Sequence, residues 1–129
     1  MRFAKIVYWT AGIWGLVIIT PLFFMFNVIG RQDPPPITHP GFYYGFATTA
    51  LAWQIAFLVI GSDPLRLRPL MIPTMIEKFG YGATVLVLFL DSRMRLGDLL
   101  LGGVDLVLGI LFVVAFYMTR LNAQALRQR

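Results

Sequence analysis

Long apolar segments separated by short polar ones dominate the sequence. The first, Ile6 to Ile29, contains no charged residue, and the second, Gly41 to Ser62, is also uncharged. Each is as long as the roughly 20 residues that cross the hydrocarbon core of a bilayer as an α-helix. The pattern therefore predicts membrane-spanning helices rather than the helices of a water-soluble protein.

Two further segments complete the pattern. Phe79 to Leu90 is uncharged but too short to span alone, so a full span begins near Pro69 and includes Glu77 and Lys78. Leu99 to Thr119 is interrupted only by Asp105. The sequence thus predicts an all-α, polytopic transmembrane four-helix bundle, one domain over residues 1–129, with helices over about 4–29, 41–62, 69–90 and 97–119.

Prolines and polar residues mark the connections. The stretch RQDPPPITHP, residues 31–40, is incompatible with a helix interior and predicts a stiff, extended external loop. Pro21 is expected to kink the first helix. Asp91 to Asp98 reads as a short turn, and Arg120 to Arg129 as a polar, basic tail.

Composition and charge agree with a membrane location. Hydrophobic residues make up 58% of the chain and charged residues 13%, against about 25% charged in a soluble domain. The net charge of +5 comes from scattered basic residues, which favours membrane lipids as partners and no nucleic acid. Four crossings put most basic residues on the side of the two termini, so both termini are predicted to be cytoplasmic in a bacterial inner (plasma) membrane.

Several chemistries lack the residues that they require. The chain has no cysteine and one histidine, His39. Disulfides, thiol redox reactions, zinc–thiolate sites and paired haem ligands are therefore excluded. No nucleotide-binding loop, serine-hydrolase elbow or metal-ligand cluster is present, so we expect no cofactor and no metal.

Three polar side chains inside the predicted spans are candidates for function. A carboxylate is costly in hydrocarbon, so Glu77 and Asp105 are each expected either to bind a ligand or handle a proton, or to form a structural contact. For Glu77 the structural alternative is an ion pair with Lys78, Arg66 or Arg68. Lys78 is expected to extend to the interface. Gln54 more often bonds between helices than binds a substrate. If all three face inward, with Trp53 and Tyr81 beside them, they form a pocket for a lipophilic molecule with one polar or cationic group.

Other residues suggest packing and lipid contacts. Gly102 and Gly109 lie seven residues apart on the face of Asp105 and permit close approach of another helix. Arg66 and Arg68 are expected to contact lipid phosphates.

The order of short motifs resembles a known kind of protein. PPPITHP, FYYGF, WQIAFLVI, DPLRLRP, EKFGYG and DLLLGGVDLVLGILF follow one another, and together they resemble small uncharacterised four-helix membrane proteins of bacteria. That resemblance implies the bundle and no particular activity.

A fainter resemblance is to the EXPERA family, four-helix proteins that include sterol isomerases and the sigma-2 receptor. Pro35, Pro36, Gln54 and Phe57 occupy places similar to that family's proline-containing stretch and polar second helix. The family's acids near helices one and two have no counterpart, so the resemblance implies a bundle with a pocket and not isomerase activity. Small multidrug transporters share this length, but they carry an essential Glu in helix one, where this chain has none.

The sequence favours one function and leaves two alternatives open. The favoured one is a non-catalytic accessory or structural subunit, with other membrane subunits or a second copy as partners. The second is an EXPERA-like binding protein or isomerase for a lipophilic small molecule. The third is a small proton-coupled transporter, which would have to dimerise. The sequence favours a protein that is not an enzyme.

Overall fold

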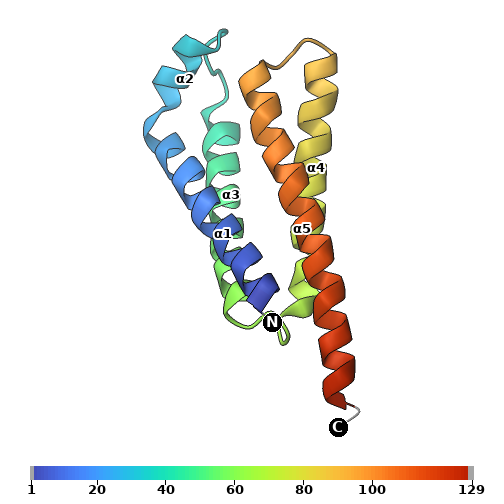
Figure 1. Cartoon of the computed structure of the whole chain (residues 1–129). Coiled ribbons are helices and arrows are strands. Elements are labelled where there is room, and N and C mark those ends of the chain that lie inside the picture. Colours follow the sequence, from blue (N-terminus) through green and yellow to red (C-terminus); the bar gives the residue numbers. More distant parts are fainter. Residues whose placement is uncertain (1, 128–129) are drawn as a thin grey trace.

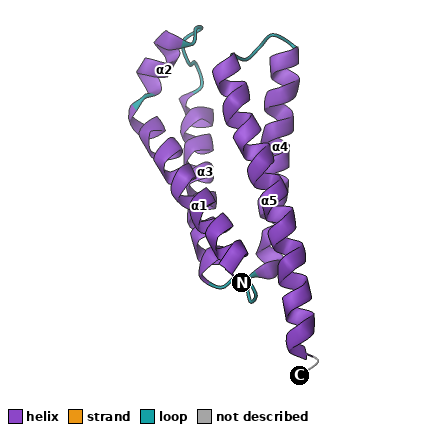
Figure 2. Cartoon of the chain, in the orientation of Figure 1, coloured by secondary structure: helices purple, strands orange, loops and turns teal. Residues whose placement is uncertain are grey.

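The computed structural model describes residues 2–127, and all the regular structure in that range is helical (Figures 1 and 2). In chain order the elements are α1 (Arg2–Ile19), the 3₁₀ turn η1 (Thr20–Phe24), α2 (Phe26–Gln32), α3 (Pro40–Ser62), the 3₁₀ turn η2 (Arg68–Leu70), α4 (Met71–Leu90) and α5 (Leu96–Arg127).

Four helical segments are long and apolar enough to cross a membrane. They are Arg2–Phe24, Pro40–Ser62, Arg68–Leu90 and Leu96–Ala125. The predicted all-α bundle of four spans is therefore confirmed. The orientation of its termini stays a prediction.

The first predicted helix is broken rather than merely kinked. Pro21 has no N–H to donate to the preceding turn, and the chain tightens there into η1 before α2 begins at Phe26. The Tyr43 hydroxyl donates to the carbonyl oxygen of Leu22 at 2.6 Å, which supplies a partner for a backbone group of the irregular turn. The ring of Phe26 stacks on Tyr44 at 5.5 Å between centroids, so α3 holds the break in place.

The last helix is longer than the sequence predicted. Of the expected polar tail, residues 120–127 continue α5 beyond Thr119, and residues 128–129 lie outside the described part of the chain. The reason is visible in the composition, because Leu, Ala, Gln and Arg are all good helix formers and no Pro or Gly follows Thr119. Figure 1 shows this part of α5 extending past the other helices.

The helices form two antiparallel hairpins whose members approach each other at glycines. A Cβ on Gly12 of α1 would lie 2.7 Å from the side chain of Leu58 in α3, and one on Gly102 of α5 would lie 2.8 Å from Val85 in α4. In a membrane, where apolar surface gains little from burial against another helix, such close backbone packing is a main source of association.

The two hairpins join at the end of the bundle where the N-terminus lies, here called the terminal end (Figure 1). Tyr8 of α1 stacks on Phe112 of α5, with ring centroids 4.3 Å apart, and Phe57 of α3 meets the Phe112 ring edge-on at 5.1 Å. The Tyr8 hydroxyl shares a hydrogen bond of 2.8 Å with Thr74 Oγ1 of α4. This aromatic core therefore contains side chains from all four long helices.

The opposite end, here called the proline-loop end, has a polar connection between the hairpins. Arg95, in the turn between α4 and α5, pairs with Asp33 at 3.0 Å and donates to the backbone oxygen of Gln32. Both charged side chains are about half exposed, so this link contributes about 0–1 kcal/mol. Between the two joined ends the hairpins stand further apart (Figure 1).

Two neighbouring glycines of α5 provide a matched pair of variants that tests this packing. Gly102→Ala brings a methyl group against the stiff Val85 side chain, whereas a Cβ on the neighbouring Gly103 meets nothing within 4 Å. We expect Gly102→Ala to lower the free energy of unfolding by about 1–3 kcal/mol and Gly103→Ala to raise it by about 0.5–1 kcal/mol. Unfolding in mixed micelles of increasing SDS content measures both, and equal effects of the two variants would contradict this packing.

Candidate functional site

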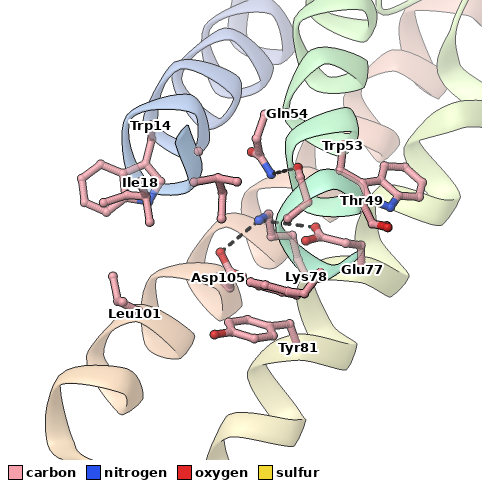
Figure 3. A pocket seen from close by; sticks show the side chains of 14 residues that line it. Trp14, Ile18, Thr49, Trp53, Gln54, Glu77, Lys78, Tyr81, Leu101 and Asp105 are labelled. Carbon is pink, nitrogen blue, oxygen red and sulfur yellow. Dashed lines mark hydrogen bonds and ion pairs between the residues drawn. The ribbon is translucent and has the colours of Figure 1, made fainter. Parts of the chain in front are cut away.

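A cavity of about 270 Å³ lies between the two hairpins. All four long helices line it, as Figure 3 shows. Its wall consists of Trp14, Gly15, Ile18, Ile19, Phe46, Thr49, Ala50, Trp53, Gln54, Glu77, Lys78, Tyr81, Leu101 and Asp105. The cavity is therefore mostly apolar and aromatic, with a few polar groups, as is usual for small-molecule sites.

An ion-paired triad forms the polar part of the wall. The Lys78 ammonium donates to Asp105 Oδ1 at 3.0 Å and lies 3.3 Å from Glu77 Oε2 (Figure 3). Lys78 is only 4% exposed, and its ammonium also lies 5.1 Å from the centre of the Phe57 ring. A lysine so deeply buried needs such partners, because an unpaired ammonium in an apolar interior is very costly.

The spacing along α4 explains how Glu77 and Lys78 come to share the triad. Lys78 belongs to the buried stripe of α4, together with Thr74, Gly82 and Val85, which repeats every three or four residues. Glu77 lies about 100° around the helix, on the cavity side with Tyr81 four residues later. Space for the lysine stem comes from Gly109 of α5, where a Cβ would lie 3.3 Å from Lys78 Cβ.

Gln54 contributes the least satisfied polar group. Its side-chain amide donates to the Ala50 carbonyl at 2.9 Å within α3, while its Oε1 is buried and has no hydrogen-bond partner among the described residues. A Cβ on Gly15 of α1 would overlap that oxygen, so glycine there is required by the position of the Gln54 side chain. Glu77 Oε2 is likewise buried without a hydrogen bond, and its contact with Lys78 is purely ionic.

Aromatic rings form the rest of the wall. Phe46 of α3 and Tyr81 of α4 lie nearly parallel, 6.2 Å between centroids. Trp14 and Trp53 stand on α1 and α3, on opposite sides of the polar groups in Figure 3. Trp14 is 41% exposed, so part of the rim opens to the lipid-facing surface of the bundle.

The five pocket residues expected from the sequence all line this one cavity: Gln54, Trp53, Glu77, Tyr81 and Asp105. Of the ion pairs expected for Glu77, the one with Lys78 forms. The prediction that Lys78 extends to the interface is wrong, since the side chain turns inward to Asp105. Its place in the buried Thr74–Gly82 stripe was the signal in the sequence for this position.

Other predicted residues lie elsewhere. Gly102 and Gly109 face α4 within the same chain. Arg68 donates to the Phe116 carbonyl at 3.3 Å, and its guanidinium lies 3.8 Å from the centre of the Phe116 ring. The Arg68 side chain therefore packs on α5. Arg66 is exposed, and its contact with lipid phosphate stays a prediction.

The polar side chains at the cavity can form ion pairs and accept hydrogen bonds. Within residues 2–127, no three His, Cys, Asp or Glu side chains are grouped so as to hold a metal ion. The polar groups at the cavity are one buried ammonium, two carboxylates paired with it, and the Gln54 amide, whose oxygen has no hydrogen bond.

Comparison with protein-family models, with curated proteins and with solved structures finds no match to this chain. The resemblances drawn from the sequence thus stay predictions. The function must be inferred from the geometry of the chain itself.

The triad predicts a strong dependence of stability on Asp105. Asp105→Ala leaves the buried Lys78 ammonium with only the non-hydrogen-bonded Glu77, so we expect a loss of about 3 kcal/mol in the free energy of unfolding. Asp98→Ala, seven residues earlier on the same helix and at the polar turn, is the matched control, with an expected loss below about 1 kcal/mol. Unfolding by SDS reports both, and similar losses would argue against a stabilising triad.

Proposed function

We propose that this multi-pass membrane protein binds a lipophilic small molecule with one polar or cationic group, in the cavity between its hairpins. The observation that carries the proposal is an aromatic cavity that also has Gln54 and Glu77 in its wall, two residues whose Oε1 and Oε2 atoms are buried without hydrogen bonds. Either feature alone is common, but together they provide a place for an apolar body and for its polar group.

The aromatic wall supports an apolar body of modest size. A cavity of about 270 Å³ admits a molecule with one ring and a short chain. Trp14, Trp53, Phe46 and Tyr81 present flat faces that stack on a ring or pack against alkyl groups.

The polar groups support binding rather than catalysis. Gln54 Oε1 has no partner among the described residues, and a buried acceptor left unpaired costs about 1–3 kcal/mol. That oxygen packs against Gly15, so a guest recovers this free energy by donating to it once the Gln54 side chain has turned toward the cavity. Glu77 Oε2 also lacks a hydrogen bond but is already ion-paired with Lys78. Both carboxylates are already paired with Lys78, so we assign them to holding the guest and not to a covalent reaction of it.

The accessory role expected from the sequence has less support. It depended on a glycine-lined face of α5 that was free for a partner. Gly102 and Gly109 on that face pack against α4, so a partner helix would have to use another surface.

We propose a bacterial inner membrane as the location, with both termini in the cytoplasm. The support is the distribution of basic residues: the end with both termini carries Arg2, Lys5, Arg66 and Arg68 in addition to Arg120, whereas the opposite loops carry Arg31, Arg93 and Arg95.

Filling the cavity tests the binding proposal. Thr49→Phe places a ring in the cavity, whereas Thr48→Phe alters an adjacent, equally exposed residue of α3 that does not line it. The probe is 4-(4-bromophenyl)butan-1-ol, whose bromine quenches the fluorescence of Trp14 and Trp53 on contact. With protein in lipid nanodiscs we expect saturable quenching, with Kd raised about tenfold or more by Thr49→Phe, equivalent to about 1.4 kcal/mol.

The control variant shows whether quenching reports binding in the cavity. Thr48→Phe is expected to leave the Kd within about twofold of the unmodified protein, less than about 0.5 kcal/mol. Quenching that never saturates, or that both variants weaken equally, would mean that the probe only dissolves in the lipid, and the proposed function would be abandoned.

The orientation is tested by cysteine labelling, which has no background because the chain contains no cysteine. In intact bacterial cells a membrane-impermeant maleimide is expected to label Thr38→Cys in the proline loop. Gln124→Cys near the end of α5 should react only after the cells are opened. The reverse pattern would invert the proposed topology.

A further inference from the structure

We propose that the cavity binds an organic cation in exchange for a proton held by the Glu77–Lys78–Asp105 triad. The inference rests on the proposed function and names the class of guest. It draws on the charge of the triad, the Gln54 amide in the same wall and the aromatic rings that line the cavity.

The triad does not balance electrically. Two carboxylates and one ammonium sum to a formal charge of −1 when all three are ionised. An isolated charge among apolar side chains at membrane depth is costly, and groups so placed either take up a proton or pair with a counterion. An empty cavity is therefore expected to hold one extra proton on the triad.

No neighbouring element supplies the missing positive charge. Among the described residues, α1 brings the Tyr8 hydroxyl, which bonds to Thr74 one turn before Lys78. The uncharged helix α3 brings Gln54. Tyr81 of α4 also lines the cavity, Asp98 lies two turns before Asp105 on α5, and neither carries positive charge. The cation must then come from the guest or be a proton.

The geometry provides for an organic cation in particular. Glu77 Oε2 and Gln54 Oε1 are buried acceptors without hydrogen bonds, and Gln54 as a whole is 3% exposed. The rings of Trp14, Trp53 and Tyr81 line the same space, and aromatic faces attract ammonium groups, most strongly when these are desolvated. A positively charged head beside Glu77 would thus meet a carboxylate and aromatic rings together.

The exchange balances in atoms and charge. The protonated triad and a permanent cation R₄N⁺ give the ionised triad paired with R₄N⁺, plus one H⁺ released to water. No covalent bond other than the O–H bond of the leaving proton changes. By linkage, the apparent Kd for the cation should fall about tenfold per unit of rising pH wherever the empty protein holds that proton.

The experiment uses an isosteric pair of probes. (4-Bromobenzyl)trimethylammonium carries a permanent charge and no titratable proton, and 1-bromo-4-neopentylbenzene replaces its nitrogen by carbon. Binding to the full-length protein in nanodiscs of neutral lipid is followed by tryptophan quenching, and proton release by a pH indicator in weakly buffered solution. We expect the cation to bind at least about tenfold more tightly than its neutral isostere at about pH 8 and to release about one proton.

The outcomes separate this inference from the proposed function. Saturable binding of both probes with equal Kd and no proton release would overturn the exchange and leave the binding function standing. Absence of saturable binding by either probe would reject both. Cation-selective binding without proton release and without pH dependence would overturn the exchange alone.

Replacing Glu77 tests whether its carboxylate supplies the negative charge that binds the cation. Glu77→Gln keeps the shape of the side chain and makes the triad neutral, so proton release should disappear and the preference for the cation should fall about tenfold or more, while the neutral isostere still binds. Asp91→Asn, an exposed acid in the turn after α4, is the control and should behave as the unmodified protein. Unchanged proton release in Glu77→Gln would refute the assignment.

Discussion

The burial of Lys78 is the constraint on which the middle of this bundle depends. An ammonium with 4% exposure at membrane depth must be neutralised within the protein, and Asp105 and Glu77 do this from two helices. The pair with Asp105 links α4 to α5, and Gly109 leaves the space that brings them together. Breaking such a pair leaves an uncompensated buried charge, so the triad both links the two helices of this hairpin and gives the cavity its polar wall.

Hydropathy and helix signals were sufficient to predict the fold in outline. Spans of about 20 apolar residues have few alternatives in a bilayer, where backbone groups must bond within the segment. The points at which the helices end were less predictable, because Pro21 breaks the first helix and residues 120–127 continue the last helix. In both places local backbone geometry and helix propensity decided the structure, and hydropathy carries no information about either.

The candidate site was predictable in part. Gln54, Glu77 and Asp105 stand out because polar groups in apolar spans are rare, and the helices bring them to one cavity. The direction of Lys78 was missed, because extension to the interface is usual near the end of a span and outweighed the four-residue spacing from Thr74 and Gly82. Trp14 and Phe46 were missed as well, since aromatic residues in a membrane helix face lipid, a neighbour or a cavity equally well by composition.

The joining of the hairpins at both ends has a consequence for how a guest arrives. The aromatic core around Tyr8 and Phe112 fills the terminal end, and Arg95 with Asp33 links the opposite end. We therefore expect a guest to enter sideways, past the partly exposed Trp14, from the bilayer. Occupancy would depend on the concentration of the guest dissolved in the bilayer rather than in water, so partitioning would fill even a site of modest intrinsic affinity.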